Sequence, residues 1–223
     1  MNVATIKKEL LKMPELPRLV GELASALEEE HQRRQTFYDW VDENSKVEFI
    51  NGEIIEHSPV ADEHSTTFNY LSTTLNVHNN FNDLGGVRLE KAMVSLSRND
   101  YEPDLCFWLK SVADYFKKGQ THYPAPNWIC EILSKGTEDR DRTIKFDDYA
   151  AHGVQEYWIV DPRLQTIEQY LLDEEQAEYS LHKKLGIGDN IESIIIKGFK
   201  IPVLSIFDKE ANNKVIADLI QKI

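Results

Sequence analysis

Apolar side chains recur at spacings of three and four between about residues 16 and 41, which predicts an amphipathic helix. The apolar positions are Leu19, Val20, Leu23, Ala26 and Leu27. A charged run from Glu28 to Arg34 follows them within the same expected helix. We therefore expect a helix that stays partly exposed to solvent.

Two short segments of alternating apolar and polar residues flank Asn51 and Gly52, a pair that favours a tight turn. The pattern predicts a β-hairpin over residues 46–56. Further strands are expected at residues 86–96, 105–109, 127–133 and 154–160, where apolar runs are bounded by turn-forming residues. Residues 112–119 favour a short helix or turn.

Helical patterns return at residues 62–79 and 141–152. Asp62 is placed to cap the first of these helices, and Gly153 to end the second. Residues 166–172, 178–185 and 191–195 predict an antiparallel meander, and residues 209–223 a C-terminal helix. We expect one α/β domain with a helical extension over residues 1–45, a core over 46–162, and the meander and last helix over 163–223.

The 223 residues include 25 Lys and Arg against 38 Asp and Glu, a net charge of −13, which disfavours general affinity for nucleic acid. No run approaches the roughly 20 apolar residues of a membrane helix. Residues 1–11 carry Lys7, Lys8 and Glu9 where a secretion signal would have a basic start followed by an apolar block. A cytoplasmic protein without a membrane partner is expected. Cys106 and Cys130 lie in apolar runs and are expected to be buried thiols.

Single acids interrupt two of the apolar strands. Asp104 precedes the run 105–109, and Glu131 lies within residues 127–133. Because burial of an unpaired carboxylate is costly, each acid should lie at a sheet end, pair with a cation or bind a metal. Two acids on neighbouring strands could converge on one Mg²⁺, which accepts one or two carboxylates together with water and substrate phosphate.

Several motifs follow one another along the chain. They are Asn51-Gly52-Glu53-Ile54-Ile55, Ser58-Pro59 with His64, Pro103-Asp104, Glu131-Ile132-Leu133-Ser134-Lys135-Gly136-Thr137, Arg140-Asp141-Arg142, Lys145-Phe146, Tyr149-Ala150, Gly153-Val154 and Glu156-Tyr157-Trp158-Ile159-Val160-Asp161-Pro162. Over residues 46–162 the chain resembles the Uma2-like endonucleases. The resemblance implies the restriction-endonuclease-like fold, a mixed β-sheet flanked by helices, with the PD-(D/E)XK type of metal site.

The resemblance assigns Asp104 as the Pro-Asp acid and Glu131 as the acid of the second strand, both binding Mg²⁺ or Mn²⁺. The usual lysine would stand two residues after Glu131 on the same strand face, but Leu133 occupies that position. The family pattern has a lysine at Lys145, which predicts that this side chain returns to the site. The alternative is that Lys145 only forms an exposed pair with Asp141.

Other polar side chains are weaker candidates. Lys135, in the loop after the second strand, is another possible source of the positive charge. The resemblance also places Glu53 and His64 at the site, where either could complete the metal coordination or orient a water. Glu63 could act in the same way from the first turn of its helix, whereas Ser134 is expected to cap a turn.

Two groups of side chains bear on nucleic-acid binding. Basic residues suited to phosphate contacts fall within eleven positions of one another: Lys135, Arg140, Arg142 and Lys145. Aromatic residues that could stack on bases lie in apolar runs or beside them: Tyr149, Tyr157 and Trp158. We expect the aromatic residues to pack in the core.

The residues and the resemblance together predict a Mg²⁺- or Mn²⁺-dependent endonuclease that hydrolyses DNA phosphodiester bonds through Asp104, Glu131 and Lys145. Two alternatives stay open. One is a nuclease-fold module that binds or assembles without cleaving, which Leu133 and the acidic charge favour; the other is a metal-dependent phosphoesterase of small substrates. A homodimer is expected by analogy with the fold. The sequence has no phosphate loop, dinucleotide turn, nucleophile elbow or paired cysteine zinc motif.

Overall fold

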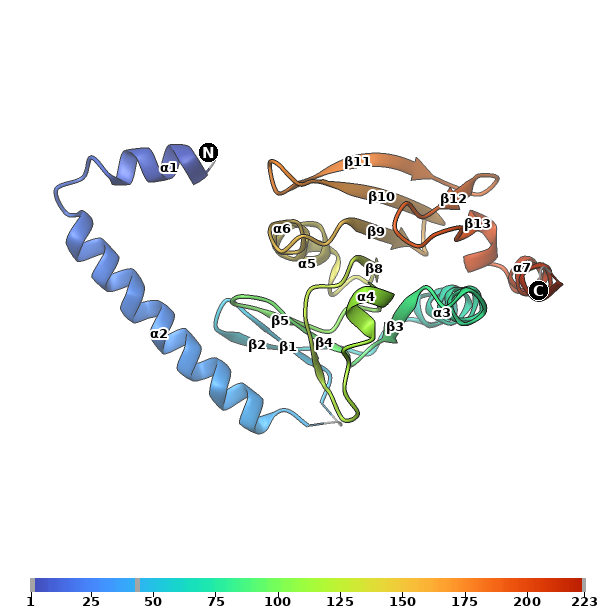
Figure 1. Cartoon of the computed structure of the whole chain (residues 1–223), viewed down its shortest axis with the longest axis horizontal. Helices are drawn as coiled ribbons and strands as arrows, with labels where there is room; N and C mark the ends of the chain where they lie inside the picture. The colour runs from blue at the N-terminus through green and yellow to red at the C-terminus, as the bar shows by residue number, and fades with distance from the viewer. Residues whose placement is uncertain (1–2, 43–44, 222–223) are drawn as a thin grey trace.

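A helical arm projects from a mixed α/β body in the computed structural model, which describes residues 3–42 and 45–221 (Figure 1). The arm contains α1 (Val3–Leu10) and α2 (Leu16–Trp40). The long helix predicted over residues 16–41 is therefore confirmed, whereas α1 was not predicted. None of the helices in the described part of the chain is both long and apolar enough to cross a membrane.

A six-stranded sheet, in the order β11-β10-β9-β8-β6-β3, forms the centre of the body. Its strands are β3 (Gly85–Leu89), β6 (Leu105–Leu109), β8 (Trp128–Ile132), β9 (Glu156–Asp161), β10 (Thr166–Asp173) and β11 (Glu178–Leu185). The pair β8 and β9 is parallel and the other neighbours are antiparallel. This confirms the expected mixed sheet flanked by helices.

Alternation along β8 sends successive side chains to opposite faces of this sheet. On one face Cys130 packs with Leu71 of α3 (Asp62–Asn82). On the other face Ile129 packs with Tyr149 of α6 (Ile144–Ala151). Glu131 shares this second face, so the strand register directs its carboxylate toward α6.

A second sheet, in the order β2-β1-β5-β4-β7, lies beside the first. Its strands are β1 (Val47–Ile50), β2 (Glu53–Glu56), β4 (Met93–Ser95), β5 (Asp100–Tyr101) and β7 (His122–Tyr123). The predicted hairpin is confirmed as β1 and β2, and its turn has positive φ angles of 50° at Asn51 and 84° at Gly52. The single strand predicted over residues 86–96 is wrong, because the chain turns at Lys91, with φ of 56°, and continues in the other sheet.

The remaining elements are α4 (Lys110–Ala113), α5 (Glu138–Arg142), β12 (Asn190–Glu192), β13 (Lys200–Pro202), η1 (Val203–Ile206) and α7 (Lys209–Gln221). The helix predicted over residues 141–152 is two helices, because Thr143, with φ of −126° and ψ of −90°, interrupts it. Gly153 follows α6 with φ of 78°, as expected. The third meander strand is wrong in its pairing, since β12 pairs with β13. Residues 222–223 of the predicted last helix lie outside the described residues.

Three smaller expectations have different outcomes. Asp62 does not cap α3: Ala61 is the cap residue, no side chain caps it, and Asp62 begins the helix. The aromatic residues expected in the core, Tyr149, Tyr157 and Trp158, are fully buried. The two cysteines are also buried as free thiols.

Candidate active site

The two acids singled out from the sequence lie on adjacent strands. Asp104 immediately precedes β6, and Glu131 lies in β8. The register pairs Leu105 with Cys130, which brings positions 104 and 131 opposite each other. The N–H of Ile132 donates to Asp104 Oδ2 at 2.8 Å, and the N–H of Asp104 donates to Glu131 Oε2 at 3.3 Å. Both carboxylates are buried.

Lys145 reaches the same point from α6. Its Nζ lies 2.9 Å from Glu48 Oε1 and 3.0 Å from Glu131 Oε1. The same ammonium lies 3.3 Å from Asp141 Oδ1. Because Lys145 is only 1% exposed, the alternative of an exposed pair with Asp141 is wrong. One helical turn further on, the hydroxyl of Tyr149 donates to Glu131 Oε1 at 2.9 Å.

Glu48 is a site residue that the sequence reasoning missed. It lies in β1 and is fully buried. The N–H of Glu102 donates to its Oε1 at 3.0 Å, and Nε2 of His57 lies 3.3 Å from its Oε2. An acid within an apolar strand was the signal that singled out Glu131, and the strand 47–50 carries the same signal.

His64 lies in the first turn of α3, beside the first acid. Its Nε2 is 3.3 Å from Asp104 Oδ2. The ring is buried, and within the described residues its Nδ1 has no hydrogen-bond partner. His57 lies next to Glu48 in the same way, so Asp104 and Glu48 each have an imidazole neighbour. The structure therefore brings His64 to the pair of acids, as the sequence analysis expected.

A small cavity of about 20 Å³ lies over these groups and adjoins a cleft of about 650 Å³. The cavity is lined by Asp104, Glu131, Lys145, Asp141, Glu102 and Lys46, among others. Five residues line both the cavity and the cleft: His57, Val60, His64, Ser134 and Thr137. The cleft is therefore the route by which a substrate could approach the buried acids.

The basic residues expected to contact phosphate divide into two groups. Lys135 and Arg140 line the cleft, and neither has an ion-pair partner in the part of the chain that the structure describes. Arg142 pairs with Glu168 at 2.7 Å and lines neither space. Lys145 is buried among carboxylates. The expectation of four basic residues on one phosphate-binding face is therefore wrong for two of them.

Three weaker candidates are also separated by the structure. Glu53 is exposed on β2 and lines neither the cavity nor the cleft, so the structure does not bring it to the acids. Glu63 lines the cleft but not the cavity. Ser134 lines both, and its hydroxyl lies 3.1 Å from the hydroxyl of Thr137, so it bonds a side chain across its turn.

Comparison with known proteins places this arrangement in a family. A sequence model of the Uma2 family, described as "Putative restriction endonuclease", matches residues 29–204. The chain belongs to the Uma2 family. A solved structure of "a putative nuclease belonging to DUF820" from Anabaena variabilis has a similar fold, with a TM-score of 0.63 at 18% identity. The match covers 77% of this Uma2 chain and 94% of that chain. No curated protein matches the chain.

The Uma2 site can be tested for its fit to a divalent cation. Among residues 3–42 and 45–221, no three His, Cys, Asp or Glu side chains already surround one point that could hold a metal. Mg²⁺, however, needs only one or two protein carboxylates, because water and substrate phosphate complete its octahedron. Asp104 and Glu131 both line the cavity, and Glu102 adds a buried Oε2 that has no hydrogen-bond partner among the described residues. The residues therefore fit a two-carboxylate Mg²⁺ or Mn²⁺ site.

Burial opposes charge on the carboxylates of this Uma2 site, and the neighbouring cations offset it unequally. Burial raises the pKa of Glu131 to about 8, even with the Lys145 ammonium beside it. For Glu48, burial is outweighed by Lys145 and His57, which lower the pKa to about 2. Burial raises the pKa of Glu102 to about 7. Burial therefore favours the neutral forms of Glu131 and Glu102, whereas Glu48 is held in its ionised form.

The other two charged groups of the site are held in their ionised forms. Burial opposes the charge of Asp104, but the hydrogen bond from His64 lowers its pKa below the usual value. Burial also opposes the charge of Lys145, but the carboxylates of Glu131 and Glu48 raise its pKa well above the usual value. Lys145 is thus a permanent cation and is not suited to act as a general base.

Proposed function

We propose that this Uma2 protein is a divalent-metal-dependent nuclease that hydrolyses phosphodiester bonds in DNA. The observation that carries the proposal is the 3.0 Å contact between Lys145 Nζ and Glu131 Oε1. Through this contact the Lys145 ammonium, carried by α6, lies beside Glu131. It supplies the positive charge that Leu133, on the strand, cannot supply. Membership of a family described as restriction endonucleases supports the reaction class.

In this proposal Asp104 and Glu131 would hold Mg²⁺ or Mn²⁺, which would supply Lewis acidity and a water of lowered pKa. Lys145 and Tyr149 both donate to Glu131 Oε1, so Oε2, which among the described residues accepts only the N–H of Asp104, would be the oxygen available to a cation. On Asp104, Oδ2 is engaged by Ile132 N–H and by His64, which leaves Oδ1 for the cation. These contacts fix both carboxylates before substrate arrives, which is how electrostatic preorganisation lowers a barrier.

The substrate strand would lie in the cleft beside the buried acids. Lys135 and Arg140 stand on the wall formed by residues 133–140 and are placed to bind the phosphates that flank the reacting one. Glu56 and Glu63 line the same cleft and repel phosphate. Together these charges hold the strand along the 133–140 wall.

A second candidate function, binding without cleavage, is favoured by one observation. Burial raises the pKa of Glu131 to about 8, which opposes the ionised form that a metal needs, so the acids could serve a buried hydrogen-bond network in place of a metal. Lys145, Tyr149 and the backbone of Asp104 already satisfy both of its oxygens. A module of this kind would bind a nucleic acid or a protein and hydrolyse nothing.

Metal titration and DNA cleavage, measured on the same proteins, test both candidates. We would titrate Mn²⁺ and Mg²⁺ by calorimetry into wild type, Asp104→Asn and Lys145→Met, and follow nicking of supercoiled and single-stranded DNA. Asp114→Asn, on a half-exposed surface pair with Lys110, is the matched control for a lost carboxylate. Cation binding lost in Asp104→Asn, with cleavage lost in both site variants and retained in the control, supports the nuclease proposal.

The other outcomes decide between the alternatives. If metal binds but neither DNA nor RNA is cut, the metal site is present and the nuclease proposal fails. Cleavage of a model phosphodiester alone would indicate a phosphoesterase of small substrates. If no cation binds at alkaline pH, where Glu131 is ionised, the acids are structural and the binding module is the better description.

A further inference from the structure

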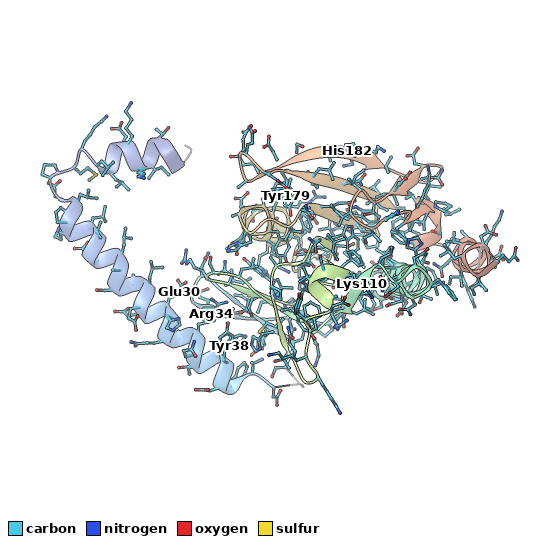
Figure 2. The ribbon with its side chains drawn as sticks, viewed as in Figure 1. Glu30, Arg34, Tyr38, Lys110, Tyr179 and His182 are labelled. Atoms are coloured by element: carbon cyan, nitrogen blue, oxygen red, sulfur yellow. The ribbon has the colours of Figure 1, made fainter. Side chains whose placement is uncertain are left out.

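The face of α2 that packs against the body continues, beyond the body, as a stripe of exposed apolar side chains. Positions 16, 20, 23, 27, 30, 34 and 37 follow spacings of four and three residues, the repeat of helices that pair with another helix. Over the last part of this face Glu30, Arg34 and Tyr38 lie where α2 meets the body (Figure 2). Phe37 is fully buried there.

The anchoring of α2 ends at Glu30. Arg34 bonds the buried Asp100 at 2.6 Å, and Glu30 bonds Arg98 at 2.6 Å. Glu30 is the first buried residue of α2. Within the described residues, the hydrogen bonds and ion pairs between α2 and the body all come from its last eleven positions, residues 30–40. The first half of α2 therefore stands in solvent, as Figure 1 shows.

The exposed half carries a stripe that we define as Leu16, Leu19, Val20, Leu23 and Leu27. Val20 is 54% exposed, Leu23 52% and Leu27 51%, whereas Leu16 and Leu19 are half-buried. Exposed apolar side chains that adjoin one another mark an interaction surface, whereas isolated ones are ordinary. The family match begins at residue 29, so the stripe belongs to this chain's addition to the Uma2 domain and not to the domain itself.

We propose that the stripe binds the same stripe of a second copy of this chain, with the two α2 helices antiparallel. An antiparallel pair centred between residues 21 and 22 sets Leu16 against Leu27 and Val20 against Leu23, which fills the seam with apolar side chains alone. Helix positions rise by about 1.5 Å each, so the body-contacting residues 30–40 of the two copies lie at opposite ends of the paired segment.

The body itself selects the direction of this pair. Glu30 and Phe37 lie on the same face of α2 as the stripe and are buried against the body. An antiparallel pair centred between residues 21 and 22 sets residues 30–37 of one copy beyond the start of α2 in the other copy. A parallel pair would set residues 30–37 of the two copies against each other, on a face that the body already covers.

Sedimentation equilibrium of the full chain over a wide concentration range tests the dimer. We expect a mass that rises toward twice 25.8 kDa. Leu23→Glu, in the centre of the stripe, should shift the protein to monomer. Ser25→Glu adds the same charge on the opposite face of the same helix, since two residues rotate the side chain by about 200°, and should leave the dimer intact. A wild-type monomer at every concentration, or equal dissociation by both variants, would overturn the proposal.

Disulfide trapping tests the direction. Leu16→Cys and Leu27→Cys proteins, mixed and oxidised with glutathione disulfide, should form the mixed dimer, because antiparallel pairing sets these positions together. In a parallel pair each variant would instead link to itself, since positions 16 and 27 are separated by about 16 Å and a disulfide spans only about 4–7 Å between Cα atoms. If the protein is instead a monomer that binds phosphatidylserine vesicles, and Leu23→Glu abolishes that binding, the stripe is a membrane-binding surface and the dimer proposal is wrong.

Discussion

At the scale of single residues, the site is defined by one ammonium shared among three carboxylates. Lys145 contacts Glu48, Glu131 and Asp141, all of them buried. A single positive charge cannot balance three negative charges in a poorly solvated site, so the carboxylates divide into ionised and protonated forms. Glu48 keeps its charge, while burial raises the pKa of Glu131 and of Asp141.

This division predicts a pH-dependent affinity for divalent cations. A carboxylic acid must lose its proton to bind a metal, and the pKa of Glu131 is raised to about 8. Below that pH we expect Mn²⁺ affinity to rise about tenfold per pH unit, and above it to level off, because one proton is displaced for each cation bound. Calorimetry in buffers of different ionisation enthalpy would measure both the affinity and the proton release.

Glu131→Gln is the control for that prediction. The amide cannot ionise, so the variant should bind Mn²⁺ weakly and lose the step near pH 8, and any remaining step near pH 7 would belong to Glu102, whose pKa is raised to about 7. Asp104 should not contribute a step in this range, because its pKa is lowered. An affinity for wild type that does not change between neutral and alkaline pH would contradict the assignment of Glu131 as a ligand.

Lys145→Met predicts a loss of stability that depends on pH. Removing one partner of a buried ion pair leaves uncompensated charge and typically costs about 3–5 kcal/mol. We expect a loss of this size in urea denaturation at about pH 8, and a smaller loss at about pH 5, because the buried carboxylates can then take up protons. Lys200→Met, which breaks an exposed pair with Glu192, should cost less than about 1 kcal/mol. Equal losses in the two variants would contradict the prediction.

At the scale of elements, the hairpin β1 and β2 places Glu48 in the site. Its turn depends on Asn51 and Gly52, both with positive φ. The Arg33 side chain covers the turn and donates from Nε to the carbonyl of Gly52 at 3.2 Å. A Cβ at position 52 would lie 2.8 Å from Arg33 Nη2. The turn therefore favours glycine mainly on conformational grounds, with a smaller steric contribution from the Arg33 side chain.

Gly52→Ala is expected to lower the free energy of unfolding by about 1–2 kcal/mol, the penalty for placing an L-residue in the left-handed region. Arg33 is exposed and can move, so the steric part should be small. Gly186→Ala is the control, since nothing lies within 4 Å of the added Cβ and its φ is outside that region. Denaturation of both variants by urea measures the difference, and an unchanged Gly52→Ala protein would show that the turn adapts.

At the scale of the whole molecule, negative charge dominates and positive charge is local. The net charge is −13, and several basic side chains of the body pair with acids, as Arg142 and Arg163 do. Lys135 and Arg140 are the cleft residues left for phosphate. If DNA is the substrate, it is held by few ionic contacts and by chemistry at the acids.

A weak salt dependence of DNA binding follows from this distribution. With about two phosphates neutralised, affinity should fall about tenfold between 50 and 200 mM salt, far less than the 10³–10⁵ of proteins with many phosphate contacts. Fluorescence anisotropy with a single-stranded oligonucleotide and Asp104→Asn, which should not cut, would measure the slope. A steep slope would mean that basic residues outside the cleft bind DNA.

Local chemistry in the sequence determined much of the protein. Periodicity identified α2, the hairpin and all strands of the central sheet except β3, because these patterns reflect which side chains each element must bury. Burial cost singled out Asp104 and Glu131, and the order of motifs identified the Uma2 family. The same burial argument would have identified Glu48, because it is also an acid within an apolar strand.

The tertiary structure decided what depends on contacts between distant segments. Only the packing of α6 against β8 brings Lys145 to Glu131 and shows that it is buried among three carboxylates. Only the sheet pairing separates β3 from β4 and leaves Glu53 in solvent. The exposure of the apolar stripe on α2 also required the structure, because an amphipathic pattern shows which face is apolar but not what covers it. Sequence patterns encode local conformation and burial, whereas a site consists of side chains from distant parts of the sequence that come together only in the folded protein.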